Sequence, residues 1–370
     1  MRRARVALDE GTGILTRPRY TVAVAATCAG LLTALLWTAT GSGRASALAP
    51  RGTSTVGSPA TAPSPPWGAT LRVLTARLFA KVAGPDPGPF GTNLEGASFD
   101  RQGGFYFVNT TAPPGQPKIM TLNLATRKVT SLYTDASSQL NCLVFGPSGT
   151  MFLCDLKAGR VARFNPSSQS LSTVLDRVGG SPLVPDDLAI DQAGDMYIAD
   201  YRGTPAAPTG RIVLRQANGT ASVVVTGLAH PNGVVFTPNE HALWVTEDLP
   251  AKLDQVADQL SSPAATAPAP TVHTAAYLSL GADAYADSLT TDGQGNVYMA
   301  VYGGHEVLMF SPAGIQIGRV ELPASASRVT HVAIKPGTRD AFVTASGPGG
   351  GYIYTFTALA PAPAGSSNGG

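Results

Sequence analysis

Six short segments of the chain repeat one pattern at a spacing of roughly 45 residues. Each segment has a polar residue, a short apolar run, a tight turn and a second apolar run, as in PDDLAIDQAGDMYIAD and ADSLTTDGQGNVYMAV. Repeats of this length that consist of strands predict a β-propeller, in which equivalent positions of all blades converge on one axis.

The repeats keep their register along the chain. Aligned on the residue five positions after the polar one, they are separated by 46, 45, 46, 55 and 43 residues. The one long interval contains SSPAATAPAP from Ser261 to Pro270, a composition typical of a surface loop inserted between strands. Three of the aligned residues, Asp100, Asp191 and Asp292, lie in D-x-x-G turns, where turn chemistry is the better explanation for an aspartate.

Further apolar segments follow each repeat, such as GRIVLRQ and ASVVVTG, so that one unit supplies four strands. The last unit supplies only THVAI, AFVTA and GYIYTFT. The segment LRVLTARLFAKV, which precedes the first repeat, is available to fill the vacant position. We therefore predict an all-β fold, a six-bladed β-propeller with the N-terminal strand closing the last blade, which removes a sheet edge.

Composition divides the chain into four parts. Residues 1–50 contain arginines, an apolar stretch and an A-x-A-like site, which predicts an export signal or a membrane anchor. Residues 51–68 form a Pro/Ser/Thr-rich linker, 69–359 the propeller domain and 360–370 a disordered tail. We therefore expect a secreted or extracytoplasmic protein that contacts a membrane only if its N-terminal segment stays uncleaved.

The charge of the chain limits its partners. The formal net charge is +2 and the lysines and arginines are scattered, so no basic stripe is available for nucleic acid. We expect a monomer that acts on a small molecule.

The polar residue that opens each repeat is the candidate site. In five of the six repeats it is an acid or an amide. Placed just before the innermost strands, these residues would meet at one mouth of the central channel. Carboxylates clustered there without a cation would raise the free energy of the fold, because they repel one another and lose their hydration. Ca²⁺, which accepts about six to eight oxygen ligands, suits such a set, and simple turn capping is the alternative. The residues are Glu95, Asn141, Asp186, Asn232, Asp287 and Thr330, the last expected as pocket wall.

Four segments resemble motifs of a known family. The segments are LEGASFD around Glu95, PDDLAID around Asp186, PNGVVFTPNEHALWVTE around Asn232 and ADSLTTDGQGNVYMA around Asp287. They are similar to metal-ligand motifs of the family that contains gluconolactonase, senescence marker protein and luciferin-regenerating enzyme, and within it most similar to drug-responsive bacterial lactonohydrolases. Asp186, Ala286 and Ser288 depart from the commonest residues of that pattern.

The resemblance implies a calcium-dependent hydrolase that opens a lactone or related cyclic ester. It implies Glu95, Asp186, Asn232 and Asp287 as metal ligands, with Asp287 also the catalytic acid or base. Zn²⁺ or another divalent metal is an alternative. A second structural Ca²⁺ would need loop ligands, for which only Ser288 and Asp176 offer themselves. No residue is expected to bind an organic cofactor. Candidate substrate-pocket residues are Asn141, Asp187, Ser288 and His331.

Two other functions stay open at this point. Phosphotriester hydrolysis uses a similar calcium centre in related propellers, so the ligands alone do not exclude it. A non-catalytic propeller that binds a ligand at its mouth is the other alternative, because a fold does not fix a function.

Cys142 and Cys154 lie on consecutive predicted strands. An exported protein could oxidise them, provided that their geometry falls within narrow limits. We favour a pair of buried free thiols.

Overall fold

The computed structural model describes residues 71–249, 251–257, 271–281 and 283–364. These residues form strands, turns and bends and contain no helix, so the all-β prediction is confirmed. It follows that no helix within these ranges could cross a membrane. The predicted export segment (1–50), the linker predicted over 51–68 and the inserted segment 261–270 lie outside the described residues.

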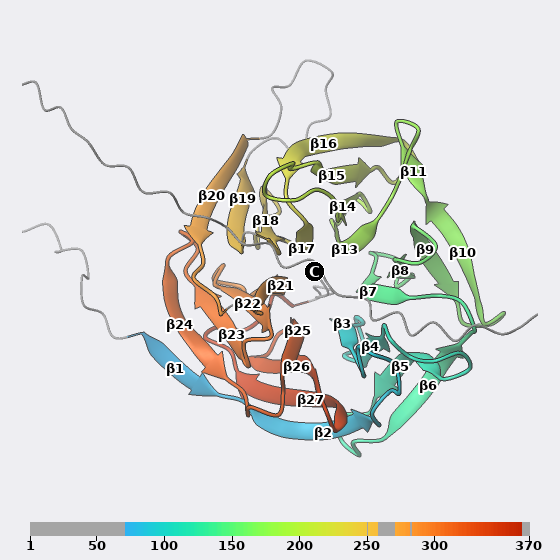
Figure 1. Ribbon diagram of the computed structural model, residues 1–370, viewed down its shortest axis with the longest axis vertical. Helices are drawn as coiled ribbons and strands as arrows, with labels where there is room; N and C mark the ends of the chain where they lie inside the picture. Colours follow the sequence, from blue (N-terminus) through green and yellow to red (C-terminus); the bar gives the residue numbers. More distant parts are fainter. Residues whose placement is uncertain (1–70, 250, 258–270, 282, 365–370) are drawn as a thin grey trace, which may run out of the picture. The chain divides into compact units, whose positions relative to one another are not determined.

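Four antiparallel sheets of four strands follow one another along the chain (Figure 1). In each, the first strand is innermost and the chain folds back and forth outward. The first sheet comprises β3 (Leu94–Phe99), β4 (Phe105–Asn109), β5 (Pro117–Leu122) and β6 (Val129–Thr134). The second comprises β7 (Leu140–Phe145), β8 (Met151–Asp155), β9 (Arg160–Asn165) and β10 (Ser170–Leu175), followed by the hairpin of β11 (Arg177–Val178) and β12 (Ser181–Pro182). The third comprises β13 (Pro185–Ile190), β14 (Met196–Asp200), β15 (Gly210–Arg215) and β16 (Ala221–Leu228). The fourth comprises β17 (Pro231–Phe236), β18 (Ala242–Glu247), β19 (Lys252–Ala257) and β20 (Thr271–Tyr277).

The remaining strands form one nine-stranded sheet, which consists of two sets joined by the single pair Tyr302–Arg328. The N-terminal segment adds one strand to each set. β1 pairs in parallel with β24, and β2 pairs antiparallel with β27, the last strand of the chain. The members are β21 (Tyr285–Thr291), β22 (Val297–Tyr302), β23 (Glu306–Phe310), β24 (Gln316–Glu321), β25 (Arg328–Ile334), β26 (Asp340–Gly347), β27 (Gly350–Thr357), β1 (Arg72–Thr75) and β2 (Arg77–Ala83).

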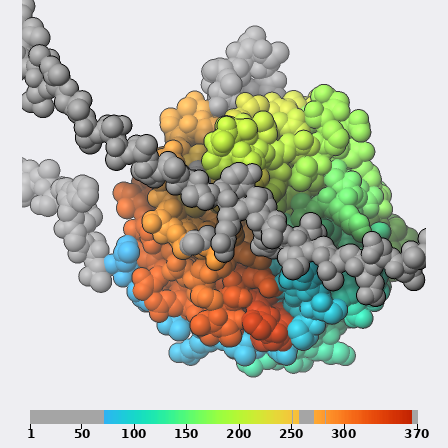
Figure 2. Space-filling model, in the orientation of Figure 1, coloured from blue at the N-terminus to red at the C-terminus, as the bar shows by residue number. Residues whose placement is uncertain are grey.

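The innermost strands form a ring. Each of β3, β7, β13, β17 and β21 contacts the next, β21 contacts β25, and β25 contacts β3. Figure 1 looks along this ring, and in Figure 2 the colours follow one another around the same face from blue through green and yellow to red. The arrangement is propeller-like, as the repeats predict.

The turns between the first two strands of a sheet depend on aspartate. The Asp292 carboxylate accepts hydrogen bonds from the backbone N–H groups of Gln294 and Asn296, both at 3.0 Å, and Asp100 does the same for Gln102 and Gly104. Asp191 likewise accepts the Asp195 N–H at 2.9 Å. The assignment of the D-x-x-G aspartates to turn chemistry is therefore confirmed for all three, since a carboxylate that fixes its own turn is a structural residue.

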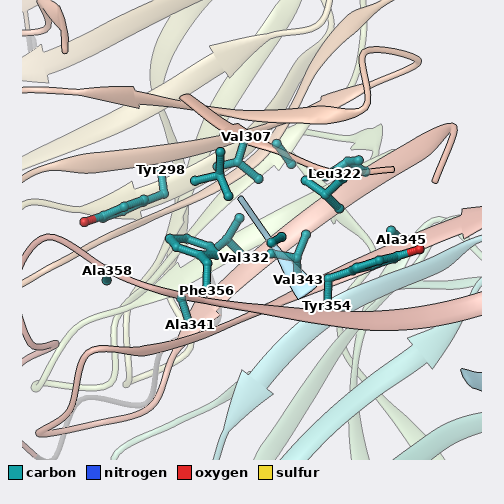
Figure 3. Close-up of a cluster of buried hydrophobic side chains, with 14 of the residues drawn as sticks. Tyr298, Val307, Leu322, Val332, Ala341, Val343, Ala345, Tyr354, Phe356 and Ala358 are labelled. Carbon is teal, nitrogen blue, oxygen red and sulfur yellow. The ribbon is translucent and has the colours of Figure 1, made fainter. Parts of the chain in front are cut away.

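Apolar side chains fill the space between neighbouring sheets. Figure 3 shows a cluster of the same kind between the two sets of the nine-stranded sheet, in which Val307 of β23 and Val332 of β25 lie near Val343 of β26 and Phe356 of β27. Tyr298 and Val343 in this cluster are fully buried. Burying one side chain of this size stabilises the fold by about 1.5–3 kcal/mol, so these layers hold the ring rigid.

The packed chain extends past residue 359, where composition places the start of the tail. Ala360 and Ala362 are each only 2% exposed. The Ala360 N–H donates to the Asp292 carboxylate at 3.1 Å, and the Gly293 N–H donates to the Pro361 carbonyl at 2.8 Å. The chain after β27 is therefore fastened to the turn between β21 and β22.

Cys142 and Cys154 form a disulfide, so the expectation of free thiols is wrong. The pairing of β7 with β8 is interrupted between the pairs Leu140–Asp155 and Leu143–Leu153. Cys142 on β7 and Cys154 on β8 both lie in this interruption and face each other. The two Cα atoms are 4.9 Å apart, within the range that a disulfide spans.

Candidate functional site

A break in strand pairing marks the predicted polar column. Between β13 and β14 the ladder passes from Pro185–Asp200 to Leu188–Ile198, so that Asp186 and Asp187 oppose a single residue. All six innermost strands show such an irregularity beside the column residue. The column residues therefore lie within the strands rather than just before them. A β-bulge re-aims side chains, and here it turns them from the sheet toward the channel.

Two glycines let the innermost strands approach one another. A Cβ on Gly96, whose φ is +57°, would lie 2.6 Å from the Leu143 backbone nitrogen of the next sheet. A Cβ on Gly233 would overlap the Leu289 side chain and lie 2.7 Å from the Ser288 Cα. No residue with a Cβ fits at these contacts. Each glycine beside a column residue therefore lets the innermost strands of two neighbouring sheets lie closer together.

Five of the six column residues line one pocket of about 370 Å³. The sequence prediction that these positions converge agrees with this placement, although Thr330 does not line the pocket. Its hydroxyl donates instead to the Leu94 carbonyl at 2.6 Å. The pocket is lined by Glu95, Asn141, Asp186, Tyr201, Asn232, Asp248, Leu249, Tyr285, Asp287 and Tyr302.

The pocket concentrates negative charge. None of the described residues that line it carries a positive charge. The pKa of Glu95 is raised well above its ordinary value, first by burial and then by Asp287 and Asp186. The pKa of Asp287 is raised by burial and by Asp186, and that of Asp186 by burial and by Asp187. These carboxylates repel one another across the pocket, and no positive charge among the described lining residues balances them.

The amides beside the carboxylates are unequally satisfied. Asn141 donates to the Asp186 carboxylate at 2.7 Å, and Asn93 donates to Glu95 at 3.0 Å. The side-chain oxygen of Asn232 is buried and has no hydrogen-bond partner. Buried carbonyl oxygens are seldom left unpaired, so this oxygen lacks a positively polarised partner.

A divalent cation fits this donor set. Within the described ranges no three or more His, Cys, Asp and Glu side chains are arranged to hold a metal ion by themselves. The pocket offers both carboxylate and amide oxygens as ligands, which is the chemistry that hard cations prefer. The orphaned oxygen of Asn232 and the mutual repulsion of the three acids both favour a positive charge in the pocket.

Three residues predicted as pocket members do not line the pocket. Asp187 is 1% exposed and its carboxylate accepts the Leu188 N–H at 2.8 Å. Its pKa is about 7 because burial raises it, and the backbone of Leu188 and the Ser288 hydroxyl partly oppose that effect. Ser288 donates its N–H to the Asp287 carboxylate at 2.9 Å and thus helps to orient it.

The third of these residues, His331, is 1% exposed on β25, and its Nε2 has no hydrogen-bond partner. Burial lowers its pKa to about 4, so the ring is neutral at physiological pH. His331 is therefore a buried neutral side chain outside the pocket. Asp176, the proposed loop ligand for a second Ca²⁺, follows β10, and its carbonyl accepts the Leu183 N–H at 2.9 Å.

Five residues of the pocket are not among the candidate site residues of the sequence analysis: Tyr201, Asp248, Leu249, Tyr285 and Tyr302. Tyr201 follows β14 and Asp248 follows β18, and the Tyr201 hydroxyl donates to the Asp248 carboxylate. The Tyr201 ring also stacks on His230 with 4.6 Å between ring centroids. Tyr285 begins β21 and Tyr302 ends β22. The second strand of each sheet returns to the channel mouth. Residues that end this strand or follow it could therefore have been predicted to lie near the site.

The chain is similar to known lactonases. A model of the SMP-30/gluconolactonase/LRE-like region matches residues 95–347. The chain belongs to this family. It is 28% identical to lactonase drp35 of Staphylococcus saprophyticus over 311 residues, which cover 81% of this chain and 92% of the relative. Family membership and such relatives support lactone hydrolysis.

Solved structures of the family share the fold. A gluconolactonase of Xanthomonas campestris aligns with a TM-score of 0.60 and 16% identity over 76% of this chain and 89% of its own. A calcium-binding regucalcin of Agrobacterium tumefaciens aligns with the same TM-score of 0.60 and 16% identity, over 80% of this chain and 99% of its own. At this level of identity the likeness shows the fold alone.

Proposed function

We propose that the protein is a calcium-dependent lactonase whose site is the pocket at the mouth of the central channel. One observation carries the proposal: three buried carboxylates from three sheets, Glu95, Asp186 and Asp287, face one pocket with no positive side chain among its lining residues. The calcium-binding regucalcin with the same fold and the drp35 relatives support the choice of metal and reaction.

The proposed architecture is a six-bladed propeller. The nine-stranded sheet counts as two blades, since only the pair Tyr302–Arg328 joins its two sets. The ring of six innermost strands supports this count. In the last blade the pairing of β2 with β27 supplies the fourth strand, so the N-terminal segment closes the ring.

The proposed ligands of the cation are Glu95, Asp186, Asn232 and Asp287, with Asn141 holding Asp186 in place. A bound Ca²⁺ would supply Lewis-acid polarisation of the lactone carbonyl. Zn²⁺ and other divalent ions are the alternatives that metal add-back distinguishes.

Asp287 is the proposed acid or base. Its carboxylate lies in the pocket and is oriented by the Ser288 N–H at 2.9 Å, while the Thr246 hydroxyl holds its backbone carbonyl at 2.9 Å. It would take a proton from water as that water attacks the carbonyl carbon, and return the proton to the ring oxygen as the ester bond breaks. Tyr285 and Tyr302 would cover the apolar part of the ring.

The protein is proposed to act outside the cytoplasm. The disulfide between Cys142 and Cys154 supports this location, since disulfides persist in oxidising compartments.

A panel of aliphatic and aromatic lactones, with a fluorophosphate triester beside them, tests the proposal. The purified protein is assayed after chelation and again after Ca²⁺ or Zn²⁺ is added back. We expect lactone hydrolysis that chelation abolishes and Ca²⁺ restores. Hydrolysis of the triester alone, or lactone hydrolysis that chelation leaves unchanged, would contradict it. Glu95→Gln and Asn232→Ala should each lower the activity, and unchanged rates in both would exclude the proposed ligands.

A further inference from the structure

A second pocket, of about 320 Å³, lies beside the central one between the first and second sheets. Loops that follow β4, β6 and β8 line it, and these strands all return toward the end of the sheets at which the column residues lie. Thr110 joins the two pockets, because it lines the second pocket while its hydroxyl donates to Asn141 of the first at 3.4 Å. The two pockets are therefore neighbours on either side of the Thr110–Asn141 contact.

Lys118 is the only buried ion among the described residues that line this pocket. It is 3% exposed, and its ammonium donates to the Ala112 carbonyl at 3.0 Å. The nearest carboxylate oxygen, of Asp135, is 4.0 Å away. That carboxylate is already engaged by the Ser138 hydroxyl at 2.8 Å and the Tyr133 hydroxyl at 3.1 Å. Because an ammonium has three donors, Lys118 keeps unused hydrogen-bonding capacity.

Lys157 adds a second positive charge. It is exposed and lines the same pocket. The pKa of Lys118 is lowered first by burial, and Lys157 lowers it further against the opposing effect of Asp135. Two ammonium groups that repel each other across a cavity favour an anion between them.

The remaining lining residues limit the kind of anion. Pro89, Pro114 and Ala136 form apolar wall, and Phe90 is 71% exposed at the rim. Inorganic phosphate would leave this apolar surface uncovered. A carboxylate at the end of a hydrocarbon arm satisfies both the ammonium groups and the apolar wall.

We propose that the pocket around Lys118 binds a carboxylate of the substrate, so that preferred substrates are lactones that carry a free carboxylate on an arm. The ring occupies the central pocket, and the arm passes Thr110 to reach Lys118 and Lys157. This inference rests on the proposed lactonase function and names its substrate class.

The test compares lactones with carboxylate-terminated arms of increasing length against matched amide-terminated lactones. For the calcium-loaded wild type we expect kcat/KM to favour the best acid over its amide by roughly tenfold or more, chiefly through KM. Lys118→Met should remove most of this preference for the acid. Lys157→Gln changes an exposed residue and should lower the ratio of kcat/KM for the acid to kcat/KM for the amide by about threefold. For the amides, whose arm carries no charge, both substitutions should change kcat/KM less than they do for the matched acids. Lys128→Gln, an exposed lysine in the turn between β5 and β6, is the matched control and should change nothing.

Two outcomes overturn the inference: a wild type that does not prefer acids, or a preference that survives both substitutions. Binding of glutarate to the calcium-loaded protein, measured by calorimetry, separates this inference from the lactonase proposal. If the wild type opens no lactone, the lactonase proposal fails. Weaker glutarate binding in Lys118→Met and Lys157→Gln then supports the carboxylate pocket, and equal binding in all variants excludes it.

Discussion

Replacing Glu95 with glutamine should make the metal-free protein more stable. Glu95 is 4% exposed, and burial, Asp287 and Asp186 raise its pKa well above the ordinary value. A carboxyl group whose pKa is raised by folding contributes its stability below the pKa of the unfolded chain, and that stability is lost as pH rises through the folded pKa. At pH 8 without metal, Glu95 therefore costs free energy, either as a buried charge or through the proton that it takes up, and a neutral glutamine of the same length does not.

The size of the effect follows from the burial. Burying a polar group without a compensating partner costs about 1–3 kcal/mol in protein mutants, so Glu95→Gln should raise the free energy of unfolding in chelator by about that amount. For a domain of this size, one kcal/mol moves Tm by roughly 2–4 °C. Calcium at a concentration a hundred times its Kd should stabilise the wild type by about 2.7 kcal/mol, and the variant should lose most of that gain. The order of the two Tm values should thus reverse between chelator and calcium.

Thermal unfolding at pH 8, in chelator and in excess Ca²⁺, measures both effects. Asp155→Asn is the matched control because Asp155 is equally buried but paired, with Arg160 at 3.1 Å and the Gln139 N–H at 3.1 Å. This change should destabilise the protein by about 1–4 kcal/mol whether or not calcium is present. A Glu95→Gln variant that is less stable than the wild type in chelator would refute the reasoning.

Three further predictions address catalysis, pH and the disulfide. Asp287→Asn should lower kcat for lactones by about 10²–10⁴-fold in a protein that stays folded by circular dichroism, and a kcat within twofold of the wild type would exclude Asp287 as acid or base. Because burial lowers the pKa of His331 to about 4, the unfolded chain binds a proton that the folded one does not, and stability should fall by about 3 kcal/mol as pH drops from about 6.5 to 4. His331→Gln should remove that part of the pH dependence measured by urea unfolding, and an unchanged slope would contradict it. Reduction of Cys142–Cys154, which closes a loop of 12 residues, should lower the free energy of unfolding by about 3 kcal/mol, and Tm in the presence of dithiothreitol checks this.

The repeat pattern was enough to predict the strands and the convergence of five column residues. Strand periodicity and turn chemistry are local, so the D-x-x-G turns and the apolar runs could be recognised without the fold. The bulges could not, because a break in pairing depends on the partner strand as much as on the strand that contains it. For this reason Asp187 and His331, which adjoin column residues in sequence, were expected in the pocket although they do not line it.

The same limit explains the missed pocket residues. Tyr201 and Asp248 belong to different sheets and are separated by 47 positions in the chain, yet the hydroxyl of one donates to the carboxylate of the other. Only closure of the ring brings them together. The disulfide was misjudged for a similar reason, since its geometry depends on the interruption that sets Cys142 opposite Cys154.

Six buried acids of the described residues form two sets that the sequence alone does not separate. One set ends the second strands and is paired: Asp155 with Arg160, Asp200 with Arg211, and Glu247 with Lys252. These cations belong to the third strand or begin it, so each ion pair ties two strands of one sheet together.

The other set lies at the bulges of the first strands and has no cation. Glu95, Asp186 and Asp287 are as buried as the paired acids, but their neighbours are further acids and amides. The fold supplies an arginine or lysine to each of the three acids that end second strands and none to the three in the pocket, so it gives up stability at the pocket. The absence of compensation at the described bulges, rather than the number of acids, is therefore the strongest physical argument that a cation binds there.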